Sequence, residues 1–168
     1  MMEVTSLQSR WSSFVIAVLV AAAYYAATAW VTGPAYLADE IGYLTNAAFI
    51  AGHEIQGASS YHAGYSFLLS PLFYLLDDTH VIWQGIMLIN AVMWGAAIGQ
   101  IHWIARRLFP SVSAGVVLFA TLLVACYPAN LVMSGYAFSQ SAVAFVFVTS
   151  VSFLFAVDTS RPWTVLPH

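Results

Sequence analysis

Residues 14–32 read FVIAVLVAAAYYAATAWVT, a run of apolar residues without a single charge, and this stretch decides the fold class. A helix rises about 1.5 Å per residue, so about 19 residues cross the roughly 30 Å hydrocarbon core of a bilayer. Three further apolar runs follow at about 81–104, 112–133 and 142–157. The pattern predicts an all-α polytopic membrane protein with about four transmembrane helices.

The composition supports a single transmembrane module over residues 1–168. The chain is 61% hydrophobic and 7% charged, whereas soluble domains are about 45–50% apolar and about 25% charged. The net charge of −3 and the lack of a basic cluster argue against nucleic acid as a partner. Cys126 is the only cysteine, which excludes an internal disulfide and a cysteine-based metal motif.

The loop between the first two spans, residues 33–80, holds five of the seven carboxylates. Gly33-Pro34 ends the first helix. The stretch LADEIGYLTN at 37–46 then opens an amphipathic segment that reaches about Ala51 and predicts a short helix in the membrane interface. Its expected apolar face is made by Ile41, Leu44, Ala48 and Ala51, and its expected polar face by Asp39, Tyr43 and Asn46.

A second apolar segment in this loop, residues 64–76, is too short to span. It has about 12 apolar residues, includes Pro71, and is predicted to be interfacial or re-entrant. If it does not cross, the arginines share one side of the membrane and most carboxylates the other. The arginines are Arg10, Arg106, Arg107 and Arg161, and the carboxylates on the opposite side are Asp39, Glu40, Glu54, Asp77 and Asp78.

The excess of arginine on one side predicts a cytoplasmic N-terminus and an external 33–80 loop. Four Arg, no Lys and many Ala indicate a bacterial plasma membrane protein. Ala27-Thr28-Ala29 resembles a signal-peptidase site, but the preceding apolar run is longer than a signal peptide requires. An uncleaved anchor is therefore the preferred interpretation.

Two adjacent carboxylates, Asp39 and Glu40, are the candidate catalytic groups. A carboxylate at the membrane surface can take a proton from an acceptor hydroxyl; the alternative is a solvated acidic loop. His53 and His62 in the same loop can bind phosphate or act as acids near neutral pH, or be ordinary loop histidines. The two carboxylates alone make a poor metal site, so no metal and no cofactor are assigned.

Two amides within the apolar run at 81–104 have a structural explanation. Asn90 and Gln100 are expected to form hydrogen bonds between helices, as buried amides do in membranes. The predicted spans contain no Asp, Glu, Arg or Lys, which disfavours a transporter or flippase component, because transporters place such residues near the midplane.

The order of these motifs resembles the amino-terminal part of the polytopic GT-C glycosyltransferases. The resemblance rests on the external Asp39-Glu40-x-x-Tyr43, on Tyr61-His62-Ala63-Gly64-Tyr65 before the segment ending at 71–75, on Arg106-Arg107-Leu108-Phe109-Pro110, and on 128–136. It covers roughly residues 14–157. It implies a membrane enzyme that transfers a sugar from a polyprenyl-phosphate donor to a hydroxyl group on the external face.

Carried over, the resemblance implies Asp39 as general base on the acceptor hydroxyl and Glu40 in support. The candidate substrate-binding residues are Tyr43, His53, His62 and Tyr136. The chain departs from the family at His62-Ala63-Gly64, where many relatives have Pro-Pro-Gly, and at 134–140, where metal-dependent relatives have a further carboxylate. The second departure disfavours a divalent metal.

Family members are longer, so we expect the chain to be the amino-terminal portion of a larger protein or to work with a partner membrane protein. A polyprenyl phosphate needs cations as it leaves, and the predicted topology places every arginine on the other side. The isolated chain is therefore expected to be inactive. The alternative is a non-catalytic accessory or vestigial membrane protein.

Overall fold

The computed structural model describes residues 2–55 and 59–157, with side chains described from Arg10 onward, and every regular element in this part of the chain is a helix. Each predicted span has a helical counterpart with shifted ends. The seven helices are α1 (Met2–Thr28), α2 (Ala38–Ile50), α3 (Ala63–Leu75), α4 (Thr79–Leu108), α5 (Ala114–Ala125), α6 (Pro128–Ser134) and α7 (Gln140–Ala156).

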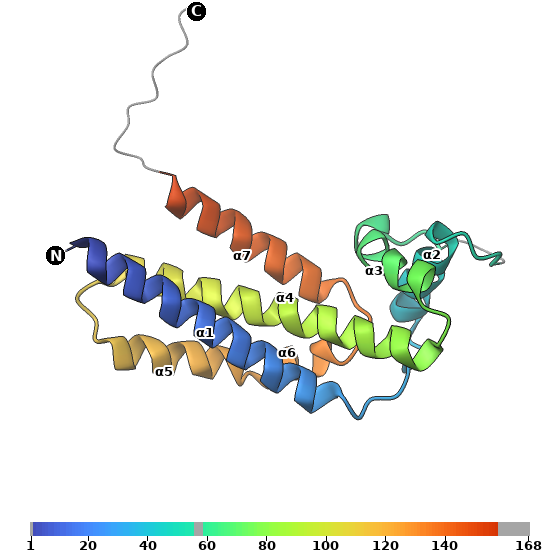
Figure 1. The fold of residues 1–168 in the computed structure, drawn as a ribbon, viewed down its shortest axis with the longest axis horizontal. Coiled ribbons are helices and arrows are strands. Elements are labelled where there is room, and N and C mark those ends of the chain that lie inside the picture. Colours follow the sequence, from blue (N-terminus) through green and yellow to red (C-terminus); the bar gives the residue numbers. More distant parts are fainter. Residues whose placement is uncertain (1, 56–58, 158–168) are drawn as a thin grey trace, which may run out of the picture.

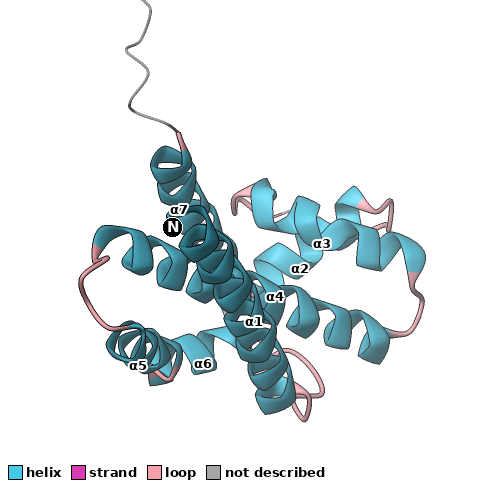
Figure 2. Ribbon diagram, turned by 60° about the vertical axis from the view of Figure 1, so that its left-hand side comes forward, coloured by secondary structure: helices cyan, strands magenta, loops and turns pink. Residues whose placement is uncertain are grey.

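Helix α4 is the centre of the molecule. It packs against α1, α3, α5, α6 and α7, and α1, α4, α5 and α7 all run along the long axis (Figure 1). Helices α2 and α3 pack on each other at the end where α4 begins, and lie to one side of the bundle (Figure 2). The short apolar segment predicted at 64–76 is thus a helix outside the bundle.

The lengths of the helices support a membrane protein. The segment Arg10–Thr28 of α1 and the whole of α4 are long and apolar enough to cross a bilayer. Helices α5 and α6 count as a third crossing if they are one span, but they meet at a 52° bend. Pro128 opens α6 and leaves the residue before it extended, which accounts for the break. Helix α7 is apolar but has 17 residues and falls short of the same length.

The buried face of α2 differs from the predicted one. Tyr43 and Asn46, expected on the outer polar face, are buried, whereas Ile41 is 44% exposed. The polar face is buried because it finds partners there: Asn46 Oδ1 accepts a hydrogen bond from the Ser59 N–H at 2.8 Å, and Ser66 Oγ donates to the Tyr43 carbonyl at 3.0 Å. Asp39 is exposed and Ala48 is buried, so Tyr43, Asn46 and Ile41 are the residues that depart from the predicted amphipathic pattern.

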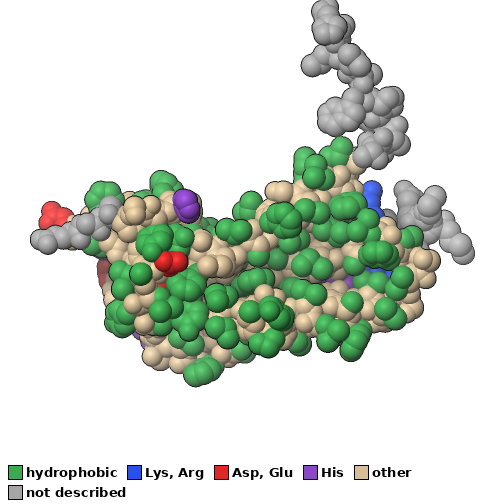
Figure 3. All heavy atoms as spheres, turned by 180° about the vertical axis from the view of Figure 1, so that it is seen from behind, with side chains coloured by type: hydrophobic (Ala, Val, Ile, Leu, Met, Phe, Trp, Pro, Cys, Tyr) green, Lys and Arg blue, Asp and Glu red, His purple; other side chains and the backbone are tan. Residues whose placement is uncertain are grey.

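The charged residues are separated along the long axis. Arg10 in α1 and Arg106 and Arg107 in α4 lie at one end, and the acidic side chains of the α2–α3 region lie at the other (Figure 3). The hydrogen bond between Ser13 Oγ and His102 Nδ1, 2.8 Å long, joins α1 and α4 near the arginine end. The predicted separation holds for these residues; Arg161 lies outside the described residues.

Candidate functional site

The two adjacent carboxylates of α2 lie in opposite environments. Asp39 is exposed, and its Oδ1 accepts a hydrogen bond from the Tyr61 hydroxyl at 2.6 Å. Glu40 is completely buried, and its Oε1 accepts from the Ala137 N–H at 3.0 Å. Consecutive residues on a helix point about 100° apart, so when one carboxylate faces outward the other can enter the interior.

The second oxygen of Glu40 is unusual, because Oε2 is buried and has no hydrogen-bond partner among the described residues. A buried carboxylate normally has both oxygens hydrogen-bonded. Glu40 therefore joins α2 to the segment between α6 and α7, but with only half of its hydrogen-bonding capacity used.

Three tyrosines surround the carboxylates. The ring of Tyr43 lies 5.5 Å from that of Tyr61 and 5.4 Å from that of Tyr65, the second pair at a right angle. The Tyr43 hydroxyl lies 2.9 Å from Ser139 Oγ. A continuous set of contacts thus leads from Asp39 through Tyr61 and Tyr43 to Ser139 at the start of α7.

The environment changes the acidity of two of these phenols. The hydrogen bond to Asp39 raises the pKa of Tyr61, because the carboxylate stabilises the protonated phenol and repels the phenolate. Burial raises the pKa of Tyr65, and the nearby Glu40 raises it further. Both phenols are therefore protonated at neutral pH and act as hydrogen-bond donors.

Asn90 connects the cluster formed by the two carboxylates of α2 and the three tyrosines to the bundle. It is fully buried in α4, accepts from the Tyr65 hydroxyl at 2.8 Å and donates to the carbonyl oxygens of Ser134 and Tyr136 at 3.3 and 2.8 Å. Gln100 similarly joins α4 to α7, since it donates to Thr149 Oγ1 at 3.1 Å and accepts from Ser152 Oγ at 2.9 Å. The prediction that these two amides bond across helices is confirmed.

The remaining predicted binding residues lie at different places. His53 is exposed and its Nε2 donates to the Phe73 carbonyl at 2.9 Å, near the C-terminal end of α3. His62 lies at the other end of α3, at its N-cap. Tyr136 is partly buried and stacks on Phe138, with ring centroids 5.3 Å apart. The structure thus brings Asp39, Glu40 and Tyr43 together with the Tyr136 segment, and places His53 away from them.

An apolar groove of about 1200 Å³ starts at this cluster and runs between α3, α4 and α7. Its polar lining includes His62, Tyr65 and Ser139 near the cluster, and its walls are mainly aliphatic, among them Leu68, Leu88, Val92, Met93, Val143 and Val146. The surface is visibly hollowed between the acidic end and the α7 ridge (Figure 3). Asp39 and Tyr43 do not line this groove; the cluster meets it through Tyr65 and through Ser139, whose Oγ lies 2.9 Å from the Tyr43 hydroxyl.

Sequence reasoning gave no site role to Tyr61, quoted there only as part of a motif, or to Ser139. Tyr61 lies just before the N-cap of α3, where no helical spacing applies, so the sequence pattern does not reveal its bond to Asp39. No sequence pattern points to Ser139, because its hydrogen-bond partner, Tyr43, lies 96 residues earlier in the chain.

Among the residues that the structure describes, no three His, Cys, Asp or Glu side chains come close enough to hold a metal ion. Comparisons with family models, with curated proteins and with solved structures found no match. The fold and the site therefore define a class, a helical membrane protein with a cluster of carboxylates and tyrosines at one end.

Gly42 allows Tyr61 to reach Asp39. A Cβ atom at Gly42 would overlap the ring of Tyr61 and lie 2.9 Å from Ser59 Oγ. We expect Gly42→Ala to displace the ring and to lower the free energy of unfolding by about 1–3 kcal/mol, the usual cost of overpacking. Thermal unfolding in detergent, followed by circular dichroism, measures this.

Gly64→Ala is the matched control, because nothing lies within 4 Å of a Cβ atom at Gly64. The two variants add the same methyl group, one under the Tyr61 ring and one in open space. Equal stability of both would show that Tyr61 does not lie over Gly42.

Proposed function

We propose that this chain is the amino-terminal part of a GT-C-type glycosyltransferase, which transfers a sugar from a polyprenyl-phosphate donor to an acceptor hydroxyl at the acidic end of the bundle. One observation carries the proposal: an exposed carboxylate, Asp39, is held by Tyr61, and the next residue in the chain, His62, lines a long apolar groove. The apolar groove can hold the isoprenoid tail of the donor, and the carboxylate of Asp39 can take the proton of the acceptor hydroxyl.

On this proposal Asp39 is the general base. The acceptor oxygen attacks the anomeric carbon, Asp39 takes the hydroxyl proton, and the polyprenyl phosphate leaves. The Tyr61 hydrogen bond to Oδ1 fixes the side chain and leaves Oδ2 for the acceptor. Glu40 is a positioning residue, because its bond to the Ala137 N–H holds the first turn of α2 against the bundle.

Charge placement limits what this chain can do alone. A leaving phosphate requires cationic or hydrogen-bonding groups, whereas Arg10, Arg106 and Arg107 lie at the opposite end of the bundle. His62 is the residue of the groove lining nearest the cluster that can carry a positive charge. We therefore infer that further cations come from another segment or a partner membrane protein, and that the acidic end faces outward from a bacterial plasma membrane.

Asp39→Asn tests the proposal. Membranes containing the complete enzyme are supplied with a radiolabelled polyprenyl-phosphate sugar, and transfer to an added acceptor is measured. Loss of a general base lowers the rate by about 10²-fold or more, with unchanged protein level and thermal stability. Asp77→Asn, a change of the same kind at the same end of the bundle, is expected to leave transfer unchanged. Wild-type transfer by Asp39→Asn would refute the assignment of the base.

The second candidate is a non-catalytic accessory subunit. It is favoured by the structural use of the carboxylates, since Glu40 binds a backbone N–H and Asp39 binds Tyr61. This candidate predicts that the chain copurifies with another membrane protein and that Asp39→Asn leaves the activity of that complex unchanged. The Asp39→Asn transfer assay distinguishes the two candidates directly.

A further inference from the structure

A second groove lies at the arginine end of the bundle, far along the axis from the carboxylates. It has a volume of about 790 Å³ and lies between α1 and α5, with α4 as its floor. This volume is within the range of about 300–1,000 Å³ that is typical of sites for small molecules. Trp11 and Leu19, which mark its length along α1, are eight residues or about 12 Å apart.

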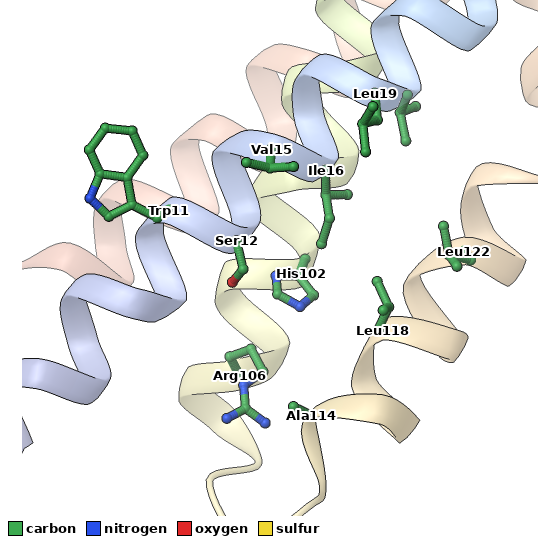
Figure 4. Close-up of a pocket in the computed structure, with 11 residues that line it drawn as sticks. Trp11, Ser12, Val15, Ile16, Leu19, His102, Arg106, Ala114, Leu118 and Leu122 are labelled. Carbon is green, nitrogen blue, oxygen red and sulfur yellow. The ribbon is translucent and has the colours of Figure 1, made fainter.

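The groove has a polar end and an apolar end. Ser12, His102 and Arg106 gather at one end, and Leu19, Leu118 and Leu122 lie toward the other (Figure 4). The polar end lies close to the C-terminus of α4 at Leu108, and thus near the end of a helix long enough to span the membrane. A molecule that fits both ends is an amphiphile with its polar group at Arg106.

The positive charge at the polar end of the groove favours an anionic ligand. Arg106 donates one hydrogen bond, from Nη1 to the Val112 carbonyl at 3.2 Å, which fixes the guanidinium at the start of α5; a guanidinium has five N–H donors. Ala114, the first residue of α5, also lines the groove, so the positive end of that helix dipole lies there. No carboxylate is found among the described residues that line the groove.

We propose that this groove binds an anionic glycerophospholipid of the adjacent leaflet, with the phosphate at Arg106 and one acyl chain along Leu19, Leu118 and Leu122. The site is independent of the proposed glycosyl transfer, because it lies at the opposite end of the bundle and shares no residue with the carboxylate cluster. Its occupant would fill the space between α1 and α5.

Native mass spectrometry of the purified chain in detergent tests this proposal. The chain is equilibrated with equal amounts of phosphatidylglycerol and phosphatidylcholine that have identical acyl chains. One arginine near a membrane surface favours an anionic lipid by about fivefold, so we expect retention of phosphatidylglycerol in that excess. Millimolar inorganic phosphate is not expected to displace it, because phosphate lacks the acyl chain.

Three variants distinguish lipid binding in the groove from non-specific attraction between the arginines and an anionic lipid. Arg106→Gln is expected to abolish the preference, whereas Arg107→Gln is expected to keep it, because Arg107 lies over the Trp103 ring and does not line the groove. Leu118→Trp fills the apolar end and is expected to reduce retention of both lipids.

Either of two results would overturn the proposal: equal retention of both lipids by the wild-type chain, or the same loss of preference in Arg107→Gln as in Arg106→Gln. The wild-type comparison decides the question even if a variant fails to fold.

Discussion

Glu40→Ala is expected to lower the free energy of unfolding by about 2–4 kcal/mol, since it leaves a buried donor unpaired and opens a cavity. The donor is the Ala137 N–H, which is bonded to Glu40 Oε1 in the interior. The cavity forms next to Tyr43 and Tyr65, whose packing connects α2 to α3 and α4. Unfolding in detergent with increasing denaturant, followed by circular dichroism, measures the loss.

Glu40→Gln separates the hydrogen bond from the charge. The glutamine carbonyl can still accept from the Ala137 N–H, while an uncharged NH2 group takes the place of the unpartnered Oε2. We therefore expect this variant to lie within about 1 kcal/mol of the wild-type chain, because neutral replacement of a buried charge is often tolerated. If Glu40→Ala were as stable as Glu40→Gln, the bond to Ala137 would contribute nothing to the fold.

The helices of the bundle could be predicted from the sequence because each contains a long apolar run. The ends of the helices could not be predicted. Helix α1 begins at Met2, although the apolar run begins at Phe14, since helical hydrogen bonding continues through the polar residues before that run. The break between α5 and α6 follows from Pro128, which the sequence displays, but the 52° angle depends on packing.

The candidate site was only partly predictable, for the same physical reason. The pair Asp39 and Glu40 was visible as charge in an apolar chain, but which of them is buried depends on Ala137, 97 residues later. From the local sequence alone, both carboxylates would be expected in a solvent-exposed first turn of α2. Likewise, the Tyr61 bond to Asp39 joins residues 22 apart in the chain, beyond the reach of a helical pattern.

Gly99→Leu is expected to disrupt the bundle by separating α1 from α4. A Cβ atom at Gly99 would lie 2.7 Å from the Ser13 carbonyl oxygen and 2.7 Å from Ala17 Cβ, and one at Gly95 would lie 2.7 Å from Ala21 Cβ. Glycines four residues apart thus face small residues four apart on α1, a pattern that lets membrane helices approach closely.

Because backbone atoms limit this contact, no rotamer change can make room for a side chain, and the two helices must move apart. We expect Gly99→Leu to cost at least about 3 kcal/mol of unfolding free energy, the upper end of overpacking penalties. Gly115→Leu is the control, since nothing lies within 4 Å of a Cβ atom at that position in α5. Both variants gain about 1 kcal/mol of helix propensity, so their difference in melting temperature measures the α1–α4 contact. A Gly99→Leu variant as stable as Gly115→Leu would contradict this packing, and with it the alignment that places Arg10 and Arg106 at one end.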